Sequence, residues 1–329
     1  MTRPDVSIVI PMYQELDNAE DTLAAVAAEL EREGWDFELV PVSDGSTDGT
    51  ADVLERLSAE DPRVRPVAYV HNRGRGHALR RGFAHARGRY VAALDADLSY
   101  TPDHAVRMVR MLIEDPETDI VLASPYMPGG RVEGVPFVRL LFSRTGNWVL
   151  RRTLARPVYT STGVVRAYRA DALRALDLTS DGKEIHLEIL SEAMALGMRI
   201  VEMPAVLRSR KKGKSKFRPR RTVASHLVFS MLERPAAIFG AVALGLFAVA
   251  ALIGLYLLTV YFAGELNPER PLMTVMVLLL LGGAVGMSFA LLGMQLVGMR
   301  RQLVRMQSEL LGIRRELRER DSKAATGDG

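Results

Sequence analysis

The sequence contains no cysteine, which excludes disulfide bonds and thiolate metal sites and leaves the redox compartment open. It also lacks a long apolar run at its beginning. The apolar part of MTRPDVSIVIPMY is too short for a signal peptide and soon meets polar residues, so we expect the first domain to stay in the cytosol. Long apolar runs are confined to Pro235–Val297. The 329 residues therefore allow a large α/β domain followed by a membrane part.

Short apolar runs predict buried strands at Val6–Ile10, Phe37–Val42, Val64–Val70, Tyr90–Leu94 and Ile120–Ser124. Helical patterns lie between them, the first beginning near the capping candidates Asp17 and Asn18 and running to about Glu33. Strands that alternate with helices at this spacing predict βαβ units. We therefore expect an α/β fold with a mostly parallel sheet.

The fourth of these runs ends abruptly at three polar residues, Asp95, Asp97 and Ser99. In an open α/β sheet the carboxyl ends of the strands face the ligand crevice. Two carboxylates one residue apart in that place can hold a divalent ion and leave positions open for phosphate oxygens. The alternative is a strand-to-helix loop with acidic capping residues. The loops after the first three strands are also rich in Asp, Gly, Asn, Arg and Glu, which favours a nucleotide site.

Four motifs carry a resemblance to a known family: PMYQE, SDGSTDGT, NRGRGHALRRG and DAD. Their order and spacing resemble those of family-2 glycosyltransferases with the GT-A fold, a Rossmann-like domain. They are most similar to polyprenyl-phosphate sugar synthases of the dolichol-phosphate mannose synthase type. The resemblance covers roughly residues 5 to 217. It implies transfer of a hexose from GDP-mannose or UDP-glucose to a polyprenyl or dolichyl phosphate, with inversion and with Mg²⁺ or Mn²⁺ as cofactor.

The resemblance also implies a nucleotide-sugar site formed by residues that follow the first four strands: Pro11, Tyr13, Glu15, Asp44, Arg75 and Asp95. In it Asp44 is similar to the family's base-recognising aspartate, and a carboxylate suits a ring N–H of uracil or guanine. The implied metal ligands are Asp95, Asp97 and Ser99, the last standing where close relatives often have Gln.

The candidate catalytic residues that the resemblance implies are Asp97, Arg131, Arg144, Arg166, Arg210 and Lys216. Pro125 replaces the arginine of the family's S-R-Y-x-x-G-G, and we expect Arg131 to supply the missing charge. A polyprenyl phosphate is ionised at neutral pH, so its oxygen needs no strong general base. Catalysis would then depend on positioning and charge stabilisation. Glu188 matches a recurring acidic position, and the alternative is a structurally paired carboxylate.

Nine of the fourteen residues from Arg208 to Arg221 are basic, and none is acidic. Such a run can bind nucleic acid, lie on anionic lipid or be a solvated tail. An apolar segment begins soon after it, which favours the lipid surface over nucleic acid. The family's R-x-x-G-x-S-K is matched by Arg210, Gly213, Ser215 and Lys216, and the resemblance implies contact of this loop with phosphates.

The division that we expect is a GT-A domain over 1–221, an interfacial helix over 222–235, membrane helices over 236–262 and 272–298, a cytoplasmic coiled-coil helix over 299–320 and a disordered tail over 321–329. Both apolar runs exceed the roughly twenty residues needed to span a bilayer. Basic flanks predict an integral protein of the plasma membrane with the catalytic domain and both termini in the cytoplasm. Glycines in the second run permit close helix packing.

Apolar residues after the second run recur at strict 3,4 spacing: Leu296, Met299, Leu303, Met306, Leu310, Ile313 and Leu317. This pattern predicts a parallel coiled coil and hence a homo-oligomer, with a helix lying on its own domain as the alternative.

Three other functions remain open: a processive polysaccharide synthase, which the lack of Q-x-x-R-W disfavours, a glycosyltransferase with another lipid acceptor, and a catalytically inactive membrane scaffold. The sequence does not identify the sugar.

Overall fold

The computed structural model describes residues 3–134, 158–208, 235–263 and 271–326. The chain divides into two compact units, Met1–Ser225 and His226–Gly329, and each is described by itself. The expected interfacial helix over 222–235 lies almost entirely outside the described residues, since only Pro235 belongs to them.

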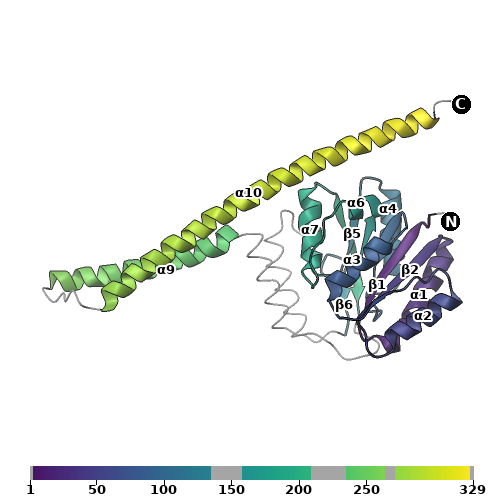
Figure 1. The fold of residues 1–329 in the computed structure, drawn as a ribbon, viewed down its shortest axis with the longest axis horizontal. Coiled ribbons are helices and arrows are strands. Elements are labelled where there is room, and N and C mark those ends of the chain that lie inside the picture. Colours follow the sequence, from purple (N-terminus) through teal and green to yellow (C-terminus); the bar gives the residue numbers. More distant parts are fainter. Residues whose placement is uncertain (1–2, 135–157, 209–234, 264–270, 327–329) are drawn as a thin grey trace. The chain divides into compact units, whose positions relative to one another are not determined.

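The first unit is built on a seven-stranded sheet with the order β3-β2-β1-β4-β7-β5-β8 (Figure 1). Its strands are β1 (Val6–Met12), β2 (Phe37–Asp44), β3 (Val67–Tyr69), β4 (Tyr90–Ala93), β5 (Ile120–Ser124), β7 (Arg166–Arg169) and β8 (Ile200–Pro204). The mostly parallel sheet is confirmed, with one exception: β7 runs antiparallel to both β4 and β5. A second, two-stranded sheet pairs β6 (Arg131–Val132) with β9 (Val206–Leu207).

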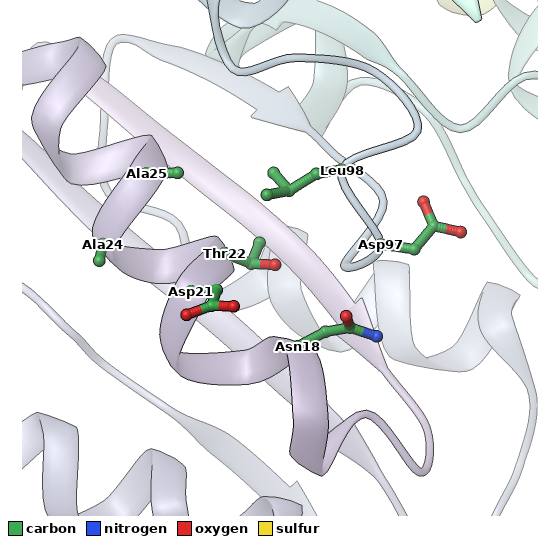
Figure 2. Close-up of a pocket in the computed structure, with 7 residues that line it drawn as sticks. All are labelled: Asn18, Asp21, Thr22, Ala24, Ala25, Asp97 and Leu98. Atoms are coloured by element: carbon green, nitrogen blue, oxygen red, sulfur yellow. The ribbon is translucent and has the colours of Figure 1, made fainter. Parts of the chain in front are cut away.

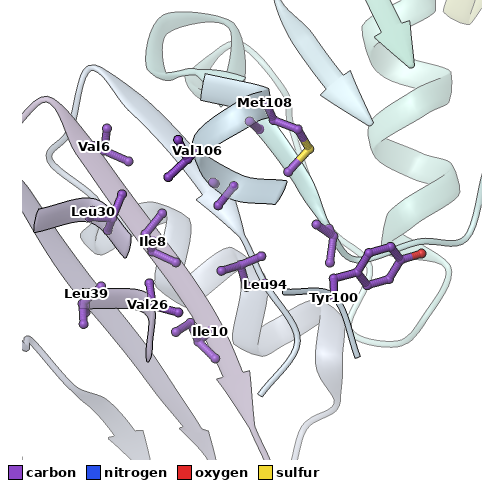
Figure 3. Packing of buried hydrophobic residues seen from close by; sticks show 14 of the residues in the cluster. Val6, Ile8, Ile10, Val26, Leu30, Leu39, Leu94, Tyr100, Val106 and Met108 are labelled. Carbon is purple, nitrogen blue, oxygen red and sulfur yellow. The ribbon is translucent and has the colours of Figure 1, made fainter. Parts of the chain in front are cut away.

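Helices cover both faces of the sheet. The helices of the first unit are α1 (Leu16–Glu33), α2 (Thr50–Glu60), α3 (Arg75–His85), α4 (Asp103–Glu114), α6 (Ala170–Arg174) and α7 (Ile185–Ala195). One apolar core joins α1, α2 and α4 to the sheet, with Ile8, Leu30 and Met108 fully buried in it (Figure 3). The other core joins α3, α6 and α7 to the opposite face. A parallel sheet covered on both faces explains why its strands are continuously apolar.

Two expected boundaries change. The third strand is shorter than the expected Val64–Val70, because Val64 makes only an isolated bridge to Leu39 and Val70 is 82% exposed. The first helix begins at Leu16, so neither Asp17 nor Asn18 caps it.

A buried carboxylate stabilises the amino-terminal edge of the sheet. Glu38 of β2 is 2% exposed and accepts hydrogen bonds from Ser7 Oγ (2.6 Å), Arg65 Nη1 (2.7 Å) and the Arg87 N–H (2.6 Å). Burial alone would raise the pKa of Glu38, but these donors outweigh it and hold the pKa below its usual 4.5. The ionised form therefore stabilises the fold.

The second unit contains α9 (Pro235–Phe262) and α10 (Pro271–Thr326), which pack side by side (Figure 1). Two stretches of these helices are long and apolar enough to cross a membrane: Phe239–Phe262, with mean hydropathy 2.5, and Pro271–Leu296, with 2.4. Small residues lie where the helices meet, as expected. A Cβ at Gly283 would stand 2.7 Å from the Phe247 ring, so this glycine permits the close approach.

The helix α10 continues without a break from the apolar stretch to Thr326. The helix therefore includes residues 321–326 of the tail that was expected to be disordered over 321–329, and disorder of this tail stays a prediction. Lysine and a pair of alanines favour helix there, and charged residues at helical spacing support its continuation. On the described part of this stretch, Leu296 is 67% exposed and Met299 and Met306 are each 61% exposed.

Candidate active site

The carboxyl ends of four neighbouring parallel strands bring the polar loops together. β3, β2, β1 and β4 are adjacent and all parallel, so the loops that follow them meet at one edge of the sheet. This is where an open α/β sheet binds its ligand. The four motifs of the sequence occupy these loops, as predicted.

The loop after β2 holds the loop after β1. Three of its side chains accept hydrogen bonds from consecutive backbone N–H groups at the start of α1: Ser46 Oγ from Gln14 (3.1 Å), Thr50 Oγ1 from Glu15 (3.1 Å) and Asp48 Oδ2 from Leu16 (3.1 Å). The expected caps within the helix itself are thus replaced by acceptors from a neighbouring loop. These contacts also hold Gln14 at φ +55°, a conformation that a non-glycine residue rarely adopts.

Asp44 holds the loop after β3. Its side chain is buried and accepts hydrogen bonds from Tyr69 Oη (2.9 Å), Asn72 Nδ2 (3.0 Å), the Arg73 N–H (2.8 Å) and the Gly74 N–H (3.0 Å). A carboxylate that accepts two backbone N–H groups fixes their direction. Base recognition by Asp44 stays a prediction, and the structure adds a supporting role that the sequence did not reveal.

Gly45 allows this approach. It has φ +64°, and a Cβ there would stand 2.3 Å from the Asn72 nitrogen. A larger residue would force the two loops apart. The SDGSTDGT motif thus joins three loops of the site.

The loop after β4 presents the candidate metal ligands. Asp95 is partly exposed and lies 3.7 Å from Arg75 Nη1, whereas Asp97 is buried and accepts a hydrogen bond from the Ser99 N–H (3.0 Å). Leu98 between them has φ +50°. In Figure 2 the Asp97 carboxylate points away from α1 and the Leu98 side chain points toward it.

Helix α1 supports the same loop, since Thr22 Oγ1 donates to the Ala96 carbonyl at 2.7 Å. A hollow between α1 and the loop is lined by Asn18, Asp21, Thr22, Ala24, Ala25, Asp97 and Leu98 (Figure 2). The strained residue Leu98 therefore lies against the helix while its neighbour Asp97 faces the edge of the sheet.

The carboxylates of Asp95 and Asp97 suit a hard divalent cation whose other ligands are water or phosphate oxygens. In the described part of the chain, no cluster of three or more His, Cys, Asp or Glu residues could hold a metal ion. Mg²⁺ is usually held by one or two carboxylates together with water and substrate phosphates, so Asp95 and Asp97 match this pattern. Ser99 offers a hydroxyl in the same loop, and its side chain is buried.

The loop before α7 covers the amino end of α3. A Cβ on Gly76 would stand 2.4 Å from the Ser180 carbonyl oxygen, and the His77 N–H donates to the Asp181 carbonyl at 3.1 Å. Glu188 holds this loop by accepting from the Thr179 N–H (2.9 Å) and the Ser180 N–H (3.0 Å). Glu188 is therefore structurally paired, which is one of the two alternatives that the sequence left open. The part played by residues 179–182 had no signal in the sequence.

The expected catalytic role of Arg166 stays a prediction. The Arg166 side chain is 1% exposed, and its guanidinium donates to the carbonyls of Ser161 (2.7 Å), Gly163 (2.9 Å) and His186 (2.9 Å). Because these donors are directed at backbone oxygens, we assign Arg166 a positioning role for the segment from Ser161 to Gly163.

The other expected residues are distributed as follows. Pro11 lies within β1, which ends at Met12, and Tyr13 and Glu15 follow the strand, with Tyr13 40% exposed. Arg131 lies exposed in β6, and Pro125 is buried directly after β5. Residues 144, 210 and 216 (Arg144, Arg210 and Lys216) lie outside the described residues.

Comparisons with known proteins agree with this geometry. Residues 7–177, more than half of the chain, match the sequence profile of glycosyl transferase family 2. The chain is 30% identical to dolichol-phosphate mannosyltransferase of Pyrococcus furiosus over 215 residues, 65% of this chain and 59% of that protein. It therefore spans less than two thirds of that relative. It is 32% identical to undecaprenyl-phosphate 4-deoxy-4-formamido-L-arabinose transferase of Edwardsiella ictaluri over 264 residues, 77% of each chain.

A solved structure shares the fold. Glucosyl-3-phosphoglycerate synthase from Mycobacterium tuberculosis, crystallised with Mn²⁺, uridine diphosphate and phosphoglyceric acid, matches with a TM-score of 0.51. The match covers 70% of this chain and 77% of that chain at 20% sequence identity, a level that shows likeness of fold alone. The chain thus belongs to glycosyl transferase family 2 and is a glycosyltransferase with the GT-A fold.

Proposed function

We propose that this enzyme transfers a hexose from a GDP- or UDP-hexose to a polyprenyl or dolichyl phosphate at the cytosolic face of a membrane. The observation that carries the proposal is the presence, in one chain, of a GT-A domain and two helices long and apolar enough to span a bilayer. An acceptor that resides in the membrane suits this combination. The names of the two relatives contain a dolichol phosphate and an undecaprenyl phosphate.

The Edwardsiella relative supports the lipid acceptor further. Its similarity covers 77% of this chain, which is more than the first unit contains, so it extends into the second. Its sugar differs from that of the Pyrococcus relative. We therefore specify the acceptor as a polyprenyl or dolichyl phosphate and leave the sugar open, with mannose and glucose as the leading candidates.

In the proposed mechanism, the loops that follow β3, β2, β1 and β4 orient the donor so that C1 of its sugar faces the acceptor phosphate. A phosphate oxygen of the acceptor attacks C1, the bond to the nucleoside diphosphate breaks, and the anomeric centre inverts. The acceptor is already ionised, so no residue of the chain has to remove a proton. Asp95 and Asp97 hold Mg²⁺ or Mn²⁺, which when bound offsets the charge on the diphosphate. Arg75, 3.7 Å from Asp95, is directed at the same region.

The basic segment from Arg208 to Arg221 serves both substrates in this proposal. Its first residue lies beside the metal-binding loop, because the Arg208 N–H donates to the Ser99 carbonyl at 2.8 Å. We assign Arg210 and Lys216 to phosphate contacts and the remaining charges to attraction by anionic lipid. The basic residues before α9 and after the second apolar stretch support a topology in which the protein spans the plasma membrane, with the GT-A domain and both termini in the cytoplasm.

We also propose that two or more copies associate through the C-terminal part of α10. Apolar residues at 3,4 spacing lie on one side of a helix, and three of them, Leu296, Met299 and Met306, are largely exposed. A parallel arrangement follows from the proposed topology, because α10 of every copy leaves the membrane on the same side.

A transfer assay tests the function. The full chain in detergent is incubated with a short polyprenyl phosphate, Mn²⁺ and a panel of labelled nucleotide sugars, and lipid-extractable label is counted. We expect label with one donor, loss of label in Asp97→Ala, and retention in Glu55→Ala, which removes an exposed carboxylate from α2.

Two results would contradict the proposal. Metal-dependent donor binding and slow donor hydrolysis without lipid product would refute the polyprenyl phosphate acceptor. Failure to bind any nucleotide sugar, measured by calorimetry with and without Mn²⁺, would refute the donor class.

A further inference from the structure

Strand β9 is bonded along both of its edges. On one edge, the carbonyl groups of Ala205 and Leu207 accept from the N–H groups of Arg131 (3.0 Å) and Glu133 (2.8 Å), which are the contacts to β6. On the other edge, two N–H groups of the same segment point toward the metal-binding loop and α4. β9 therefore lies between the short β6 strand and the loop that carries Asp97.

The second edge has two hydrogen bonds. The Arg208 N–H donates to the Ser99 carbonyl at 2.8 Å, and the Val206 N–H donates to His104 Nε2 at 3.1 Å. Ser99 in turn donates its N–H to Asp97 at 3.0 Å. A short series of hydrogen bonds thus runs from the candidate metal ligand to the residue with which the basic segment begins.

The hydrogen bonds of His104 define its tautomer. A backbone N–H can only donate, so Nε2 carries no proton in this arrangement. Nδ1 then carries the proton and donates to the Thr101 carbonyl, 3.0 Å away. His104 is 3% exposed, and the ring of Tyr100 packs edge-on against it with centroids 5.6 Å apart. Both ring nitrogens are thus hydrogen-bonded, and Nδ1 also lies 3.0 Å from Thr101 Oγ1.

The two bonds link separate parts of the site. Thr101 belongs to the loop between β4 and α4, whereas Val206 belongs to β9, so the imidazole joins the metal-binding loop to the strand that leads into the basic segment. An apolar residue of similar size would fill the same space but would leave the Val206 N–H without this acceptor. Packing alone therefore does not account for a histidine at this place.

We propose that His104 is a positioning residue for sugar transfer: its unprotonated Nε2 holds β9 beside the metal-binding loop and fixes the position of Arg208, the residue with which the basic segment begins. This inference rests on the proposed function, in which the basic segment contacts the phosphates. His104 does not touch a substrate. It determines the place from which the phosphate-binding charges extend relative to Asp97.

Two variants separate this role from packing. His104→Phe keeps the volume and the contact with Tyr100 but removes the acceptor. His104→Gln places an amide oxygen near the position of Nε2 and can accept from Val206. In the full chain we expect His104→Phe to lower kcat of transfer by about tenfold or more, since small misplacements at a reacting centre are costly. His104→Gln should stay within about threefold of the unmodified enzyme, and neither change should alter the Kd of the donor more than about threefold.

Hydrogen exchange gives a readout that needs no activity. We expect the peptide containing Val206 to exchange faster in His104→Phe than in the unmodified chain, with His104→Gln between them. Equal kcat in His104→Phe and the unmodified enzyme would overturn the proposal. So would a His104→Gln variant as slow as His104→Phe, or a loss of kcat matched by an equal loss of donor binding.

The two proposals fail in different ways. If the unmodified chain transfers no sugar to any polyprenyl phosphate, the proposed function is wrong, and the exchange experiment decides alone. Faster exchange at Val206 in His104→Phe would then still support the positioning role, and unchanged exchange would overturn it.

Discussion

Replacing Asp44 by Asn tests whether this carboxylate builds the donor site. The Asp44 side chain is 3% exposed and accepts from four groups of the next loop and strand. The change keeps one acceptor oxygen and converts the other into an NH₂ group. That group would face the Asn72 amide and the Gly74 N–H, so at least two hydrogen bonds to a charged acceptor are lost.

The size of the effect follows from those two bonds. Each hydrogen bond to a charged group contributes about 1.5–3 kcal/mol, so the loss is about 4 kcal/mol. For a domain of this size, 1 kcal/mol shifts Tm by about 2–4 °C, so we expect a fall of about 8–16 °C. Tyr69→Phe is the graded control, because it removes one donor and leaves the carboxylate with the others. It should lower Tm by less than half as much.

Intrinsic fluorescence of the detergent-solubilised chain during heating gives Tm, and calorimetry gives the Kd of GDP and UDP. We expect Asp44→Asn to lose both stability and nucleotide binding. A Tm within about 2 °C of the unmodified protein, together with lost nucleotide binding, would refute the reasoning. The carboxylate would then act on the base and contribute little to the loop.

Two further predictions concern glycine packing and pH. Gly76→Ala puts a methyl group within 2.6 Å of the Ser180 and Gly182 carbonyl oxygens, so we expect a lower Tm and weaker donor binding by calorimetry. The control is Gly240→Ala, because a Cβ at Gly240 has no atom within 4 Å. Equal changes in Tm and donor binding in the two variants would refute the packing argument. Glu38 has a lowered native pKa, so its stabilisation is present above the ordinary value of 4.5 and is lost as the pH falls through the native pKa. Tm of the unmodified chain should therefore fall as the pH drops below that value. The Glu38→Gln variant should have a lower Tm at pH 7, and its Tm should change less with pH in acid. Identical curves of Tm against pH for the two proteins would contradict the role of Glu38.

The sequence predicted the strands β1, β2, β4 and β5 well, because most of their residues are buried and each contains a short apolar run. Tyr90–Ala93 and Ile120–Ser124 are examples. It did not predict the parallel strand β8, whose residues are mostly only partly buried. It also did not predict β7, whose four residues RAYR begin and end with arginine. Only the tertiary structure gives Arg166 its backbone partners, so the short strand carries no local signal.

The candidate site was predicted in position but only partly in role. The order of polar loops along the chain placed Asp95 and Asp97 correctly at the carboxyl end of β4. The hydrogen bonds of Asp44 and Asp48 to backbone N–H groups of other loops could not be predicted. Almost every residue type has a backbone N–H, so the residue at the donor position gives no sign of such a bond. His104 was missed for the same reason: its partner in β9 is a backbone N–H about a hundred residues away.

The antiparallel strand has a consequence for the synthesis of the protein. β7 begins more than 70 residues after β4 ends, yet it covers the edge of β4 and joins the two halves of the sheet. At about 5–20 residues per second, the nascent chain carries an unpaired edge for roughly 4–15 s. Such an edge can pair with other chains, so this interval is when a ribosome-bound chaperone would matter most. Every strand of the seven-stranded sheet precedes α9, so the sheet can be completed before the ribosome has synthesised α9, the first apolar helix of the chain.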